Sequence, residues 1–236
     1  MPILAIDTAT LVSSVAVLDD KKILAELTLQ TKLTHSEVLM PHIKQILAMT
    51  KLEKTELEAI VISIGPGSFT GLRIGLATAK SMAYALNIPL IGVSTLAALA
   101  YHYPVENIYL APVLDAQKGN AYVALYEWQN GSLTEIHAPQ VESFDVILEK
   151  AMSLEKKVVF LGETAVKNMD KIKQSGKNIM PAMLHTIMPR AACVGMLGMK
   201  MLHEGIRHDM MNLEPFYIRR SEAEELWEIR NGKIHE

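Results

Sequence analysis

One pattern occurs twice along the chain and limits the folds that it can adopt: an apolar strand leads into an aspartate, a polar turn and a second strand. In the first half, residues 3–6 lead to Asp7, and residues 12–18 alternate small polar and apolar side chains, as a strand with one wetter face does. In the second half, residues 108–114 lead to Asp115, and another strand is expected over 121–126. The chain of 236 residues therefore predicts two similar units.

The segments that follow each repeat extend it to the order β-β-β-α-β-α. In the first half we expect a strand over 23–29, a helix from His35 to about Leu47, a strand over 59–64, a helix over 71–86, a strand over 89–93 and a helix from Thr95. The second half is a shorter copy, with a strand near 133–137, a helix over 144–153, a strand over 158–161 and a helix over 190–204. The sequence predicts an α/β fold of two domains, residues 1–104 and 105–236, the second reduced and ending in a tail.

Three helix starts carry a specific signal. Thr34 and Glu37 have the spacing of a capping box, and Ser94 is a suitable N-cap for the helix that follows it. Pro41 should kink the helix that begins after Thr34. A further capping box predicts a short peripheral helix over 221–230, which folds back or docks on a partner.

A glycine-rich block lies between the strand over 59–64 and the helix over 71–86. It reads Gly-Pro-Gly-Ser-Phe-Thr-Gly-Leu-Arg over residues 65–73. Pro66 and Gly67 suit a type II turn, in which the glycine takes positive φ. A strand, a glycine-rich turn and a helix N-terminus can bind an anion, although the block is neither a P-loop nor a dinucleotide-binding fingerprint.

Two such units facing each other would place Asp7 and Asp115 on either side of one cleft. This arrangement resembles the actin, sugar-kinase and heat-shock-chaperone superfamily, with its RNase H-like domains, whose members bind ATP and a metal between two hairpins. The resemblance makes Asp7, Thr8, Gly65, Gly67 and Asp115 the candidates for a weak ATP or ADP site. The alternative is that both aspartates only form turns, by accepting hydrogen bonds from the backbone that follows them.

Longer motifs resemble the TsaB (YeaZ) family of tRNA threonylcarbamoyladenosine biosynthesis proteins. The resemblance is close over residues 3–126 and rests on residues 5–10, 35–37, 65–73 and 114–116. It is loose beyond residue 130, until residues 215–219 match the family's Pro-x-Tyr-x-Arg.

This resemblance implies a non-catalytic scaffold subunit. It would pair with and activate the paralogue TsaD, which transfers the threonylcarbamoyl group to tRNA, and would help to recruit the ATPase TsaE. It would form a homodimer when TsaD is absent and would meet tRNA only through the complex.

The residues that carry catalysis in TsaD-like or protease chemistry are missing from this sequence. In TsaD two histidines four residues apart bind the metal, whereas Thr95 and Leu99 occupy the matching positions here. His35 and His42 lie on one helix, two turns apart, and are expected to be structural or surface residues. No Gly-x-Ser-x-Gly motif supplies a serine nucleophile. We therefore expect no metal, no catalytic residue and no protease activity.

The helix over 71–86 is apolar nearly all round, with only Arg73 and Lys80 charged. Packing on its own sheet explains one face of such a helix, so the other face predicts a contact with a partner. The residues predicted for that contact are Leu72, Arg73, Gly75, Leu76, Ala79, Met82, Ala83 and Leu86.

An alternative function is an autonomous ATP-dependent enzyme of the kinase type that uses Asp7 and Asp115. In enzymes of that type, the adenine pocket usually contains a Gly-Gly pair after a strand in the second half of the chain. At the matching place this chain has Gly162 followed by Glu163.

Composition excludes several other classes. A net charge of −3 gives no general argument for nucleic-acid binding. Cys193 is the only cysteine, which excludes an internal disulfide and a cysteine-based zinc site. No apolar run reaches membrane-spanning length and no signal sequence is evident, so a cytoplasmic protein without a membrane contact is expected.

Overall fold

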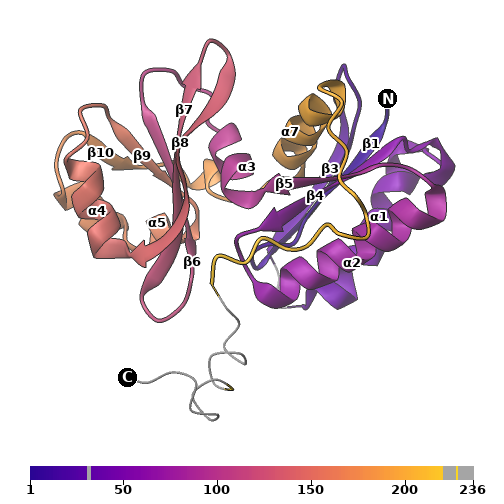
Figure 1. Ribbon diagram of the computed structural model, residues 1–236, viewed down its shortest axis with the longest axis horizontal. Coiled ribbons are helices and arrows are strands. Elements are labelled where there is room, and N and C mark those ends of the chain that lie inside the picture. The colour runs from indigo at the N-terminus through magenta and orange to yellow at the C-terminus, as the bar shows by residue number, and fades with distance from the viewer. Residues whose placement is uncertain (31–32, 220–226, 228–236) are drawn as a thin grey trace.

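The computed structural model describes residues 1–30, 33–219 and 227, and these form two five-stranded sheets (Figure 1). The first sheet contains β1 (Ile3–Asp7), β2 (Val12–Leu18), β3 (Ile23–Gln30), β4 (Ala59–Gly65) and β5 (Leu90–Ser94), in the order β3-β2-β1-β4-β5. The second contains β6 (Tyr109–Asp115), β7 (Asn120–Gln129), β8 (Ser132–Ser143), β9 (Val158–Leu161) and β10 (Ile179–Pro181), in the order β10-β9-β6-β7-β8.

The two sheets share one topology, which confirms the predicted duplication. β1 pairs antiparallel with β2 and parallel with β4, and β6 pairs in the same two ways with β7 and β9. Within the first sheet, Ile6 lies opposite Val15 on one side and Ile62 on the other. Asp7 and Asp115 consequently occupy equivalent positions, each at the end of the central strand of its sheet.

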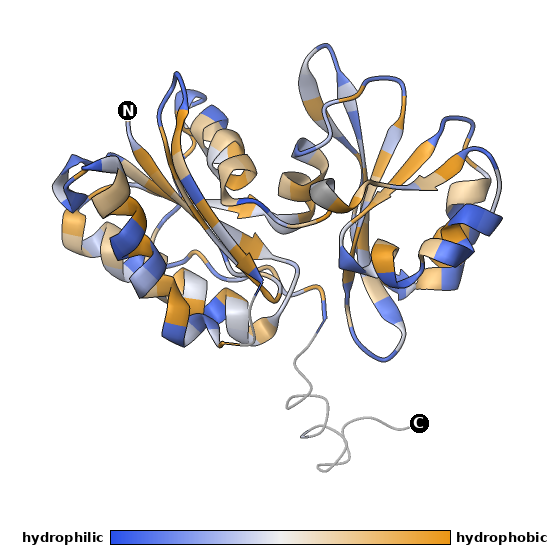
Figure 2. Cartoon of the chain, turned by 180° about the vertical axis from the view of Figure 1, so that it is seen from behind, coloured by the Kyte–Doolittle hydropathy of each residue, from blue (hydrophilic) through white to orange (hydrophobic). Residues whose placement is uncertain are grey.

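Both faces of the first sheet are covered by helices. The helices α1 (His35–Thr50) and α2 (Phe69–Leu86) pack on one face, where Leu4 and Ile6 of β1 are buried with Ile43 of α1 and Ala79 of α2. The helix α7 (Ala191–His203) packs on the other face, against Ile3 and other odd-numbered residues of β1. This two-sided burial explains why the inner strands β1 and β4 are almost entirely apolar (Figure 2).

Helix caps agree with the sequence at several positions. The Thr34 N–H donates to Glu37 Oε2 at 2.8 Å, so the predicted capping box forms. Ser94 Oγ accepts the Ala97 N–H at 3.3 Å and begins α3 (Thr95–Tyr101). Asn87 ends α2 in the left-handed conformation, with φ of 54°. α1 runs through Pro41 and ends at Thr50 rather than near Leu47.

The second sheet has shorter helices on one face and α3 on the other. On the face that buries Phe160 lie α4 (Phe144–Met152), α5 (Glu163–Lys167) and α6 (Met169–Gln174). Short 3-10 helices occur elsewhere, at Lys54–Glu56 and Leu184–Thr186. α3 buries Leu96 and Leu99 against Leu110 and Leu114 of β6, so it packs between the two halves (Figure 1). The sequence did not predict α5, α6, β10 or this position of α3.

The helix expected to complete the second half instead packs on the first sheet. The Ala191 N–H donates to Ser14 Oγ at 2.9 Å, and Arg190 forms an ion pair with Glu26 of β3. After α7 the chain stays with the first half, because Leu213 is buried beside α1 and α2 residues. Residue 104 therefore separates the two sheets along the chain, but the segment 191–213 packs outside the predicted second domain.

Two further findings concern the ends and the surface of the chain. The helix predicted over 221–230 lies outside the described residues, except for position 227. Among the described helices, none is long and apolar enough to span a membrane.

Candidate functional site

The loop between β4 and α2 has a different geometry from the predicted turn. The positive φ falls on Gly65, at 117°, rather than on Gly67, and the Gly65–Pro66 peptide bond is cis. The type II turn was therefore a wrong prediction. Ser68 is the N-cap of α2, and its hydroxyl accepts the Gly71 N–H at 3.2 Å.

The glycines of this block let α2 and its loop approach the β1–β2 turn closely. A Cβ on Gly67 would lie 2.2 Å from the Ala9 carbonyl oxygen, and one on Gly71 would lie 2.1 Å from the Thr8 carbonyl oxygen. The Thr8 hydroxyl is fully buried and donates to the Gly71 carbonyl at 2.8 Å. The absence of side chains at these glycines thus serves internal packing. Thr8 and Gly65, both predicted for nucleotide binding, are buried in that packing.

Asp7 is sealed inside the first half. It is 0% exposed, and its Oδ1 accepts the Ala9 N–H at 2.9 Å, while Oδ2 has no hydrogen-bond partner among the described residues. Burial raises the pKa of Asp7 to about 6, against the smaller lowering by the Ala9 N–H and Ser63. The prediction that Asp7 faces the cleft is wrong, because its side chain is fully buried beside Ser63 of β4.

Asp115 does line a cleft between the two halves, which has a volume of about 490 Å³. Its Oδ1 accepts the Gln117 N–H at 2.7 Å, and its Oδ2 lies 2.8 Å from Lys167 Nζ. The hydrogen bond from Lys167 holds the pKa of Asp115 below its usual value. Gly67 and Glu163 also line this cleft, so of the predicted nucleotide residues only Gly67 and Asp115 reach it.

The C-terminal segment closes one side of the cleft. Tyr217 stacks on Phe69 with ring centroids 4.7 Å apart, and Arg73 Nε donates to the Tyr217 hydroxyl at 3.0 Å. Arg219 donates to the Ala116 carbonyl of the second half. The sequence showed these residues only as a family motif and gave no contact for them. The sequence signal for these contacts was the spacing of Pro215, Tyr217 and Arg219.

The predicted partner contact on α2 is largely internal. Five of its eight residues are buried in the chain itself, namely Leu72, Gly75, Leu76, Ala79 and Ala83. Met82 and Leu86 are half-buried, and only Arg73 is exposed. Small residues at 75, 79 and 83 let the helix lie close to its own sheet, since a Cβ on Gly75 would be 2.1 Å from Thr8 Oγ1. The prediction chose the wrong face of the helix for these five residues.

The exposed faces of α1 and α2 lie side by side (Figure 1). We use the name helix-pair surface for seven of the exposed residues on these two helices: Met40, Lys44, Ala48, Arg73, Ala77, Ser81 and Tyr84. Tyr84 is 76% exposed and Met40 is 51% exposed, so the surface presents large apolar groups among small ones. It carries Lys44 and Arg73 as its only charged members.

The histidines of α1 hold the β1–β2 hairpin. His35 Nε2 lies 2.7 Å from the Thr10 carbonyl oxygen, and His42 Nδ1 lies 3.3 Å from Ser13 Oγ. Burial lowers the pKa of His42. Thr95 and Leu99 are buried. Over residues 1–30 and 33–219, no group of three or more His, Cys, Asp or Glu side chains could hold a metal ion.

Two facing copies of one mixed sheet, with a cleft between them, define the actin-like class of folds. The solved structure of YeaZ from Pseudomonas aeruginosa has this fold, with a TM-score of 0.76 and 22% identity over 92% of this chain and 99% of that chain. An ethanolamine utilization protein EutJ from Carboxydothermus hydrogenoformans shares the fold at a TM-score of 0.53 and 12% identity, over 83% and 89% of the two chains.

Sequence comparisons extend this likeness beyond the fold. The family model of TsaD, tRNA N6-adenosine threonylcarbamoyltransferase, matches residues 22–227. The protein TsaB of Bacillus subtilis, named for tRNA threonylcarbamoyladenosine biosynthesis, is 33% identical over 96% of this chain and 98% of its own length. TsaB of Escherichia coli is 30% identical over 99% of this chain and 100% of its own length. The chain belongs to the TsaB (YeaZ) family, whose members are paralogues of TsaD.

Proposed function

We propose that this chain takes part in the synthesis of threonylcarbamoyladenosine on tRNA as a non-catalytic subunit. It pairs with TsaD, holds TsaD in its active form and helps to recruit the ATPase TsaE. The names of the Bacillus and Escherichia relatives, matched over nearly their whole length, support the pathway.

The helix-pair surface is the observation that carries the partner role. By the rise of an α-helix, α1 and α2 are about 24 and 27 Å long, which suits an interface of ordinary size, about 800 Å² per partner. Exposed Met and Tyr side chains surrounded by Ala and Ser let a second pair of helices approach and supply large central contacts. The same surface would pair two copies of this chain when TsaD is absent.

The cleft supports the non-catalytic part of the proposal. Asp7 cannot reach a ligand without unpacking the first half, because it is 0% exposed. Asp115 already forms an ion pair with Lys167, which a metal-bound nucleotide would have to displace. These two positions were the basis of the kinase-like alternative, and neither geometry favours it.

The partner role is tested by one exposed position. Ala77→Arg places a long charged side chain in the centre of the helix-pair surface while leaving the core unchanged, since Ala77 is exposed. We expect the variant to melt like the parent chain and to lose co-elution with TsaD from the same organism. Met152→Arg on α4, where Met152 is 49% exposed, is the control and should still co-elute. An Ala77→Arg chain that binds TsaD normally would refute the assigned surface.

A further inference from the structure

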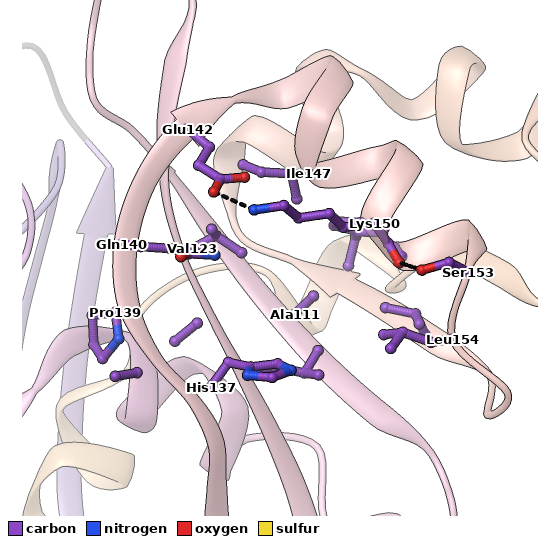
Figure 3. Close-up of a pocket in the computed structure, with 16 residues that line it drawn as sticks. Ala111, Val123, His137, Pro139, Gln140, Glu142, Ile147, Lys150, Ser153 and Leu154 are labelled. Atoms are coloured by element: carbon purple, nitrogen blue, oxygen red, sulfur yellow. Dashed lines mark hydrogen bonds and ion pairs between the residues drawn. The ribbon is translucent and has the colours of Figure 1, made fainter.

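A second cavity, of about 560 Å³, lies in the second half between β8 and α4 (Figure 3). Its floor is apolar and consists of core residues of the second sheet and of α4, among them Ala111, Val123, Ile147, Ala151 and Phe160. The volume is within the range of about 300 to 1,000 Å³ that small-molecule sites occupy. This cavity belongs to neither the interdomain cleft nor the helix-pair surface.

The cavity follows from the unequal helices on two equivalent sheets. In the first half, α1 has 16 residues and covers β2 and β3. Its counterpart α4 has nine residues, so by the rise of a helix it is about 10 Å shorter. β8 is meanwhile longer than β3, with 12 residues against eight. An apolar part of the second sheet is consequently left without a covering helix.

A bulge in β8 shapes the opening. Gln140 pairs with Val123 and His137 pairs with Leu125, so three steps along β8 match two along β7. The extra residue falls at Ala138 or Pro139, and a bulge of this kind bends the strand and changes the direction of its side chains. His137 and Gln140 line the opening on the β8 side, and Lys150 lines it on the α4 side (Figure 3).

The rim offers several hydrogen-bond donors, one of which is a lysine. Glu142 forms an ion pair with Lys150 through Oε1, and its Oε2 is closed to solvent and has no hydrogen-bond partner among the described residues. The Glu142 carboxylate is thus directed at Lys150 through Oε1, while its second oxygen is closed to solvent. Lys150 is exposed and keeps two N–H groups beyond the one directed at Glu142. The side chains of Gln140 and His137 add further N–H donors at the same opening.

From this apolar floor and donor-rich rim, we propose that the cavity binds a small organic carboxylate with an aliphatic body. The body lies on Val123, Ile147 and Phe160, and the carboxylate accepts from Lys150 and Gln140. Lys150 then lies between two carboxylates, that of Glu142 and that of the ligand. An amine head would instead be repelled by the Lys150 ammonium and would have to compete with it for Glu142.

Titration calorimetry of the full chain with octanoate tests the site, and octylamine serves as the matched probe of opposite charge. We expect one octanoate per chain, a Kd below about 1 mM, and octylamine binding at least about tenfold weaker. Lys150→Gln should weaken octanoate binding about tenfold or more, because a charge-assisted hydrogen bond is lost. Lys157→Gln, an exposed lysine outside the cavity, should leave the affinity unchanged.

A substitution that fills the cavity distinguishes octanoate binding in this cavity from binding to another apolar surface. Ala151→Phe places a ring in the cavity and should abolish octanoate binding in a chain that still melts cooperatively. If Ala151→Phe unfolds the chain, Lys150→Gln on the exposed rim still decides whether octanoate binds in this cavity. No heat with 5 mM octanoate would overturn the proposal. Octylamine binding as tight as octanoate, or octanoate binding unaffected by both variants, would also overturn it. The elements that border the cavity, α4 and β8, lie in the other half of the chain from α1 and α2 (Figure 1), so these outcomes are independent of pairing with TsaD.

Discussion

Asp7→Asn should stabilise the protein near neutral pH, because the buried Asp7 carboxyl loses its proton there at a cost in stability. Burial raises the Asp7 pKa from its ordinary value of 3.8 to about 6. Between these values the folded protein keeps a proton that the unfolded chain has released, so stability falls as pH rises through this window. The full shift of about 2 pH units corresponds to about 3 kcal/mol. Asparagine keeps the oxygen that accepts the Ala9 N–H and never becomes charged.

The measurement is urea unfolding of both proteins at several pH values. Linkage predicts that the advantage of Asp7→Asn grows from about 1.5 kcal/mol at pH 5 to about 3 kcal/mol at pH 7. Asp115→Asn is the control with the opposite sign. Because Lys167 lowers the Asp115 pKa, the stabilising effect of that carboxylate is present above its ordinary pKa and is lost as pH falls. An Asp7→Asn protein that is less stable than the parent at pH 7 would show that the buried carboxylate is compensated, and would refute the reasoning.

Three further outcomes follow from the packing around Thr8 and from the residues of the cleft. In thermal melts, Gly75→Ala should lower the free energy of unfolding by about 1 to 3 kcal/mol or more, because the new methyl group would lie 2.1 Å from Thr8 Oγ1. The control Ser81→Ala, on the exposed side of α2, should change it by less than about 0.5 kcal/mol. Titration calorimetry should give a Kd for ATP with magnesium weaker than about 100 μM, and a low-micromolar value that Asp7→Ala abolishes would revive the kinase-like alternative. Elemental analysis of chelator-washed protein should find no stoichiometric transition metal; one metal ion per chain would contradict the assignment.

Local signals in the sequence predicted most elements of the fold. Thr34, Ser94 and Asn87 mark helix ends by hydrogen bonds or backbone geometry within a few residues, so their positions agree with the structure. The stretch over 163–181 has no clear period, and its short elements α5, α6 and β10 were missed. α7 was recognised as a helix, but its sequence does not state which of two similar sheets it packs on.

The candidate site was harder to predict because burial depends on distant contacts. The same pattern, an aspartate directly after a strand, occurs at positions 7 and 115, yet Asp7 is fully buried and Asp115 lines the cleft. The apolar stripe of α2 likewise identified the helix as important. It could not show that Ala79 and Ala83 pack on the chain's own sheet and that Ala77 and Tyr84 remain for a partner.

The rate of tRNA threonylcarbamoylation by TsaD and TsaE, measured with saturating amounts of this chain, tests the scaffold role most directly. The parent chain should raise the rate, and the Asp7→Asn, Asp115→Asn double variant should raise it equally, because neither carboxylate performs chemistry. Ala77→Arg should give no increase, while Met152→Arg should act like the parent. A double variant that binds TsaD and fails to raise the rate would contradict the account, as would a rate that is the same with and without the chain.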